Sequence, residues 1–168
     1  MSEILINKVA ESGLITLNLE EWYPCEEILV FDLKDHLFMG LILKEKDFRD
    51  WIKNHHWTQY QGKAVYIFCS TDAIIPTWAF MLVTSALEKE NVMSIVGNEN
   101  DLSKSLIVHQ MNQIDISELE QQRVIIKGCA DIADPSFAMS YLVRLLQPHV
   151  MSIMYGEPCS TVPIYKKS

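Results

Sequence analysis

The strongest constraint on the fold is a repeated alternation between short apolar segments and longer apolar segments that begin at proline. The short segments are rich in β-branched and aromatic residues, which favour buried strands. They are residues 64–68, 92–96, 123–126 and 150–154. Helices are predicted from Pro76 and from Asp134-Pro135, because proline suits the first helical turn. Strand–helix–strand alternation predicts an α/β fold with a mainly parallel sheet flanked by helices.

Other segments fit the same scheme. Residues 28–31 form a plausible strand, and helices are expected over 45–54 and 101–113. The helix from Trp78 to Leu87 is apolar nearly all round, so we expect it to be well buried. The apolar run 37–43 is too short for its periodicity to separate strand from helix. Connections between the four clear strands are too long for hairpins.

Two stretches of the chain are similar to one another. Residues 65–98 and 124–157 can be aligned as two βαβ units, with Asp72 opposite Asp131 and Pro76 opposite Pro135. Convergence explains this match equally well, because buried strands and proline-started helices share composition. Both explanations predict the same architecture, a single α/β domain over residues 1–168.

Charge and hydropathy restrict the classes of partner. The chain of 168 residues carries a formal net charge of -8, which argues against binding to nucleic acid or an anionic membrane. It shows no secretory signal and no apolar run long enough to span a membrane. We therefore expect a cytoplasmic protein whose cysteines stay reduced. Glycine-rich phosphate loops and a nucleophile elbow are absent, which disfavours a nucleotide enzyme or an α/β-hydrolase.

Three cysteines follow predicted strands, where ligands of parallel sheets gather. Cys69 and Cys129 end the first strands of the two βαβ units, and Cys159 lies just past the last strand. Asp72 follows Cys69 closely. Three thiolates and a carboxylate suit zinc, and thiolates also hold iron–sulfur clusters. A catalytic thiol and inert core cysteines are the alternatives. His55 and His56 end a predicted helix, where imidazolium favours the negative end of the dipole.

Five segments together resemble a known family. They are residues 7–15, 31–34, 62–65, 73–79 and 156–165. The chain is similar over residues 4 to 167 to domain-of-unknown-function family 2480, whose members are uncharacterised bacterial proteins. The resemblance implies a small cytoplasmic protein linked to iron–sulfur assembly proteins. It also implies cysteines matching Cys69, Cys129 and Cys159 and an acid matching Asp72, all of which this sequence has.

Three functional hypotheses follow. The first is an accessory protein for metal or sulfur handling, which binds zinc or an iron–sulfur cluster through Cys69, Asp72, Cys129 and Cys159. The second is a thiol-dependent enzyme of sulfur-transfer type, with Cys159 or Cys69 as a nucleophile of low pKa. The third is a non-catalytic interaction module with structural cysteines. The sequence favours a non-catalytic role and is silent on oligomeric state.

Overall fold

The computed structural model describes residues 7–9, 14–22, 24, 26–128, 134–157 and 160–168. The chain divides into two compact units. Unit 1 comprises Met1–Pro24 and Leu106–Ser168, and unit 2 is the continuous segment Cys25–Ser105. Helix α3 (Glu99–Met111) contributes residues to both. Within the described part of the chain, no helix is long and apolar enough to cross a bilayer.

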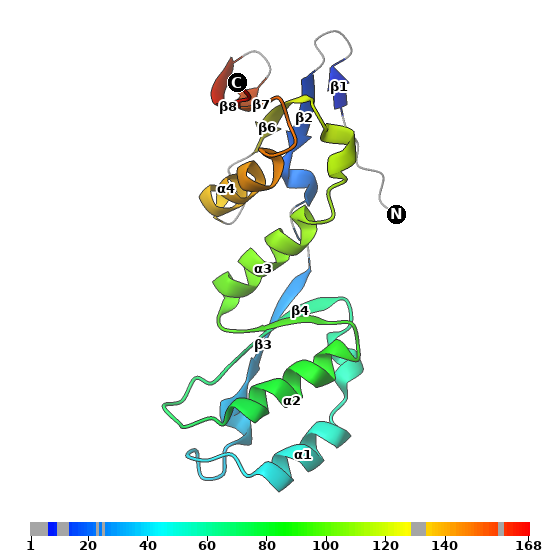
Figure 1. The fold of residues 1–168 in the computed structure, drawn as a ribbon. Coiled ribbons are helices and arrows are strands. Elements are labelled where there is room, and N and C mark those ends of the chain that lie inside the picture. Colours follow the sequence, from blue (N-terminus) through cyan, green and yellow to red (C-terminus); the bar gives the residue numbers. More distant parts are fainter. Residues whose placement is uncertain (1–6, 10–13, 23, 25, 129–133, 158–159) are drawn as a thin grey trace. The chain divides into compact units, whose positions relative to one another are not determined.

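Unit 2 is built on a three-stranded parallel sheet in the order β3-β4-β5. The strands are β3 (Glu27–Asp32), β4 (Lys63–Phe68) and β5 (Met93–Val96). Helices α1 (Glu45–Asn54) and α2 (Thr77–Glu88) pack on the same face of this sheet (Figure 1). Two 3-10 turns, η2 (Leu33–His36) and η3 (Trp57–Tyr60), flank α1 in the chain.

The core of unit 2 is formed by strand side chains that point to one face of the sheet and by the helix residues that cover them. Val65 and Ile67 of β4 are fully buried, as is Val83 of α2. These side chains share one core cluster with Phe31 of β3 and Phe48 of α1. The sheet and its two helices therefore bury a continuous apolar layer between them.

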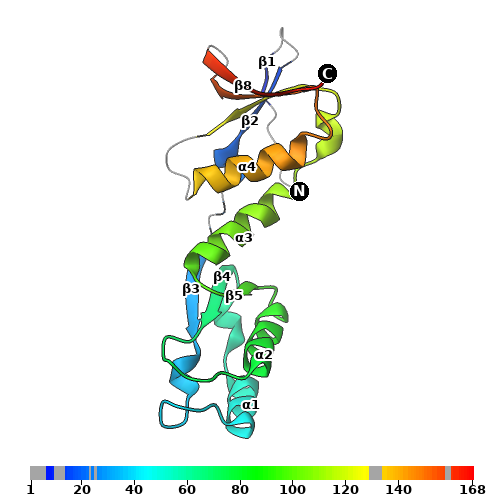
Figure 2. The ribbon, with the colours of Figure 1, turned by 60° about the vertical axis from the view of Figure 1, so that its left-hand side comes forward.

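Unit 1 contains a five-stranded sheet in the order β1-β2-β6-β7-β8. The strands are β1 (Asn7–Val9), β2 (Leu14–Asn18), β6 (Arg123–Lys127), β7 (Ser152–Glu157) and β8 (Ser160–Lys166). Strands β2, β6 and β7 pair in parallel, whereas the two outer pairs are antiparallel. Helix α4 (Pro135–Leu146) covers one face of this sheet (Figure 2), and the turns η1 (Leu19–Trp22) and η4 (Ile116–Leu119) complete the unit.

Helix α4 begins as its sequence predicts. The Asp134 side chain accepts a hydrogen bond from the Phe137 backbone N–H at 3.1 Å, and Pro135 occupies the first turn. Ala138, Leu142 and Leu146 are fully buried at helical spacing, and they pack onto the core that β2, β6 and β7 share. The cap and the apolar stripe together orient the helix on the sheet.

The predicted fold class is confirmed. The protein is α/β, most of its strand pairs are parallel, and both βαβ units are present as β4-α2-β5 and β6-α4-β7. The strands are divided between two sheets, however, and the two βαβ units belong to different ones. The division arises because β6 pairs with β2 near the N-terminus and not with β4 or β5.

Strands β7 and β8 form a tight antiparallel pair, since Glu157 lies opposite Ser160, and β8 lies beyond the four strands whose connections were predicted to be long. One finer expectation was wrong. The run 37–43 is neither strand nor helix, but a turn closed by a bridge between Phe38 and Ile42, with Met39 79% exposed. Helix α2 is buried or half-buried over most of Trp78–Leu87, as predicted, and the exposed stripe that remains includes Met81, which is 66% exposed.

The two cores predict where mutation is costly. Leu87→Ala in α2 and Leu142→Ala in α4 each remove a fully buried side chain, so each is expected to lower the free energy of unfolding by ~2–5 kcal/mol. Met81→Ala, at an exposed position of α2, is the matched control and is expected to cost less than ~1 kcal/mol. Urea denaturation followed by far-UV circular dichroism measures all three. Equal losses in all three variants would contradict this core.

Candidate functional site

Cys69 and Asp72 lie in the turn that follows β4. The Cys69 side chain is partly buried against the core of unit 2, and its Sγ donates a hydrogen bond to the Thr71 carbonyl at 3.5 Å. Asp72 is exposed. The two predicted ligands thus leave the carboxyl edge of the three-stranded sheet in the same turn, which is where α/β sheets place ligands.

Cys129 and Cys159 lie outside the described residues. Their neighbours in the chain are described, because Cys129 is two residues beyond the end of β6 and Cys159 two residues beyond the end of β7. These strands pair in parallel, so they end at the same edge of the five-stranded sheet. A salt bridge of 2.9 Å between Lys127 Nζ and Glu157 Oε1 joins the two strand ends.

Cys69 follows a strand of a different sheet from the strands that precede Cys129 and Cys159, so the expectation of one shared sheet edge is wrong for Cys69. Strand β4, which Cys69 follows, belongs to the three-stranded sheet, whereas β6 and β7 belong to the five-stranded sheet. Over the described residues, no three His, Cys, Asp or Glu side chains are grouped closely enough to hold a metal ion. The metal site of Cys69, Asp72, Cys129 and Cys159 therefore stays a prediction.

Sequence reasoning missed Asp32, which ends β3 beside the Cys69 turn. Its side chain is only 12% exposed. Asp32 Oδ1 accepts hydrogen bonds from the backbone N–H groups of Lys34 (3.0 Å) and Ser70 (3.1 Å), and the Lys34 ammonium lies 3.3 Å from Oδ2. One carboxylate thus ties the end of β3 to the turn after β4. The sequence does not reveal this role of Asp32, because it depends on the strand register that places Asp32 opposite Phe68.

The electrostatics of Asp32 follow from these contacts. Burial by itself would raise the pKa of Asp32, but the hydrogen bonds from Ser70 and Lys34 outweigh it and lower the pKa from 3.8 to about 2. Asp32 is therefore ionised throughout the physiological range. Because its lone pairs are already engaged by neighbours, its role in this edge is to position the Cys69–Asp72 turn.

A second cluster of unit 2 joins histidine and aromatic rings. The Trp51 ring lies between His36 and His55, with ring centroids 4.0 Å and 4.2 Å away. His55 Nε2 also lies 3.2 Å from the Tyr60 hydroxyl. Burial lowers the pKa of both histidines. For His36, the charges of Asp35 and Asp32 oppose this and that of His55 adds to it, whereas for His55 the neighbouring His56 adds to it. His55 directly follows α1, as expected, but the lowered pKa favours the neutral ring over the expected charge–dipole interaction.

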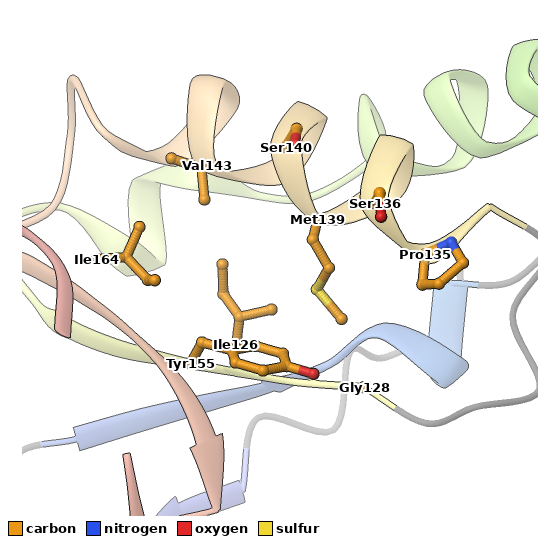
Figure 3. Close-up of a pocket in the computed structure, with 9 residues that line it drawn as sticks. All are labelled: Ile126, Gly128, Pro135, Ser136, Met139, Ser140, Val143, Tyr155 and Ile164. Carbon is orange, nitrogen blue, oxygen red and sulfur yellow. The ribbon is translucent and has the colours of Figure 1, made fainter. Parts of the chain in front are cut away.

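A groove of about 790 Å³ lies in unit 1, between α4 and the sheet (Figure 3). Met139 projects from α4 into its middle, above Ile126 of β6 and Tyr155 of β7. Gly128, which follows β6, lines the end nearest Pro135. No sequence pattern indicates this groove, because its walls come from β6, β7, β8 and α4, which come together only in the folded chain.

Comparison with known proteins identifies the family. Residues 3–167 match the family described as protein of unknown function (DUF2480). The match covers nearly the whole chain, so the protein belongs to this family, and the resemblance drawn from its sequence is confirmed. No curated protein matches it, and no solved structure does.

The lowered pKa of Asp32 predicts a pH-dependent contribution to stability. The folded state favours the carboxylate, so the contribution is full above pH 3.8 and is lost as the pH falls toward about 2. Asp32→Asn is expected to lower the free energy of unfolding by ~1–2 kcal/mol at pH 7, after allowance for solvent screening. Urea denaturation between pH 7 and pH 2.5 should show the difference from wild type shrinking. Asp50→Asn, at an exposed position of α1, is the control, and a pH-independent deficit in Asp32→Asn would refute this account.

The half-buried side chains of His36 and His55 predict a loss of stability in mild acid. Their folded-state pKa lies below 6.5, so the unfolded chain takes up more protons and stability falls as the pH drops below 6.5. His36→Phe keeps a ring against Trp51 but removes the titration, so it should lose less stability than wild type between pH 7.5 and pH 5.5. His109→Phe, at an exposed position, is expected to behave as wild type. Urea midpoints at the two pH values give the comparison, and identical pH dependence in His36→Phe and wild type would rule the effect out.

Proposed function

We propose that this protein binds zinc or an iron–sulfur cluster through cysteine thiolates and acts as an accessory protein in metal or sulfur handling. The observation that supports the proposal most is the pairing of β6 with β7, since both strands end at one sheet edge and each leads within two residues to a cysteine. Thiolate sulfur is a ligand that both zinc and iron–sulfur clusters take.

The proposal can be tested by determining which residues bind the metal. Cys129 and Cys159 belong to the chain segments of unit 1, whereas Cys69 and Asp72 belong to unit 2. If Cys129 and Cys159 bind without Cys69, the remaining ligands must come from elsewhere in unit 1, from a partner protein or from a second copy of the chain, because zinc takes four ligands.

The proposed compartment and partners follow from the same chemistry. Metal binding requires reduced thiols, and thiols stay reduced in the cytoplasm, so we propose a cytoplasmic protein. Iron–sulfur assembly proteins are the class of partner that a cluster-binding accessory protein would need. A thiol-dependent enzyme with Cys159 or Cys69 as its nucleophile stays a prediction from the sequence, since Cys159 lies outside the described residues.

An interaction module with structural cysteines is the second candidate function. One observation favours it, which is the exposed apolar turn over residues 38–42. Phe38, Met39, Leu41 and Ile42 are 45%, 79%, 65% and 55% exposed. Exposed apolar side chains gathered in this way are typical of protein-binding surfaces. This candidate needs no metal, so metal analysis separates the two.

The metal proposal predicts a composition that can be measured. Full-length protein purified without oxygen should hold about one zinc per chain, or iron with an equivalent amount of acid-labile sulfide. Cys129→Ser and Cys159→Ser should each lose most of that content, and Cys25→Ser is the matched control that should retain it. Elemental analysis and visible absorption provide the readout, with circular dichroism to confirm folding.

The remaining variants decide the ligand set. Loss of metal in Cys69→Ser and Asp72→Asn supports the four-residue site, whereas retention in both confines the site to Cys129 and Cys159. Sub-stoichiometric zinc and iron in the wild type would overturn the proposal and favour the interaction module. Zinc that is retained equally by every cysteine variant would be adventitious and would overturn it as well.

A further inference from the structure

The groove in unit 1 has walls of a consistent chemical kind. Over the described residues, its lining carries no charged side chain, and most of it is apolar. The described lining residues are Ile126, Gly128, Pro135, Ser136, Met139, Ser140, Val143, Tyr155 and Ile164. The polar side chains among them are two serine hydroxyls on α4 and one tyrosine hydroxyl on β7. These walls give a charged ligand no counter-ion, and desolvating a charge against them would be costly.

The end of the groove nearest the start of α4 is also unsuited to anions. A helix N-terminus attracts negative charge, and Pro135 and Ser136 of the lining lie in this first turn. Here, however, the Asp134 carboxylate already accepts the hydrogen bond of the Phe137 N–H. Its negative charge meets the positive end of the helix and repels a second anion, so the groove does not resemble a phosphate or carboxylate site.

The groove exists because α4 presents two different faces. Leu142 of α4 is fully buried in the core, whereas Ser136 and Ser140 are exposed and too small to reach the sheet opposite. Gly128 lacks the Cβ that would collide with the terminal methyl group of Met139. The space under Met139 is therefore kept open by small residues on both walls.

Met139 makes this space adaptable. Its side chain is long, unbranched and partly buried, and it lies in the middle of the groove between the helix and Tyr155 (Figure 3). Methionine changes rotamer easily and packs well against rings and chains of different shape. A ligand can thus displace the end of Met139 and keep contact with it.

We propose that this groove binds an uncharged, mainly apolar small molecule that carries one hydrogen-bonding group for the serine and tyrosine hydroxyls. Its volume of about 790 Å³ is typical of small-molecule sites, which bury an apolar ligand body and orient it with a few polar groups. The inference is argued without the metal proposal, because none of the described residues that line the groove is a proposed metal ligand.

Two dyes with the same carbon skeleton test the charge preference. N-phenyl-1-naphthylamine is uncharged and carries one N–H donor, and 8-anilinonaphthalene-1-sulfonate adds a sulfonate to it. Full-length protein should bind the uncharged dye saturably, with a rise in fluorescence, and the sulfonate at least about tenfold more weakly. Equal affinity for the two dyes, or no saturable binding of the uncharged dye, would overturn the proposal.

Two tryptophan variants test the location. Ser140→Trp places a large ring across the groove at an exposed helix position, so the fold should survive while affinity for the uncharged dye falls about tenfold or more. Ser85→Trp, at an exposed position of α2 in unit 2, is the matched control and should bind as wild type. Circular dichroism confirms that both variants fold. Equal affinity of the two variants would place the dye elsewhere and refute the site.

Discussion

The pairing of β2 with β6 is the constraint on which the rest of the structure depends. Ile15 lies beside Val124 and Leu17 beside Ile126, in a parallel register that brings the N-terminal segment to a strand more than a hundred residues later. All four side chains are buried in one core. Everything between the two strands must then leave this sheet and return to it. The segment 25–105 does so by forming a separate α/β unit with its own sheet and core.

This pairing also decides which strand ends are neighbours. Strand β6 has β2 on one side and β7 on the other, so the chain following β6 and the chain following β7 leave from one edge. The turn after β4 has β3 and β5 as neighbours instead, and Asp32 of β3 is the side chain that it meets. A site predicted from residues at strand ends therefore requires that the strands belong to the same sheet.

Burial and hydrogen bonding give the two units different chemical character. In unit 2, neighbours set the charge of polar groups, since hydrogen bonds from Ser70 and Lys34 lower the pKa of Asp32 and burial among aromatic rings lowers the pKa of His36. In unit 1, the described walls of the groove between α4 and the sheet offer hydroxyl groups and apolar surface without charge. The proposed metal binding and the proposed binding of an uncharged molecule are tested by separate experiments.

The sequence by itself determined the local elements. The helix of residues 135–146 follows from Asp134-Pro135 and a buried stripe at helical spacing, and β4 and β6 follow from runs of β-branched residues, because caps and periodicity act over a few neighbouring residues. Even the α/β class follows from the alternation of these elements. Only the tertiary structure decided that β6 pairs with β2, that Asp32 faces the turn after β4 and that Met139 lies over an open groove. These depend on contacts between residues far apart in the chain, where many pairings bury similar apolar surface and no local pattern selects one of them.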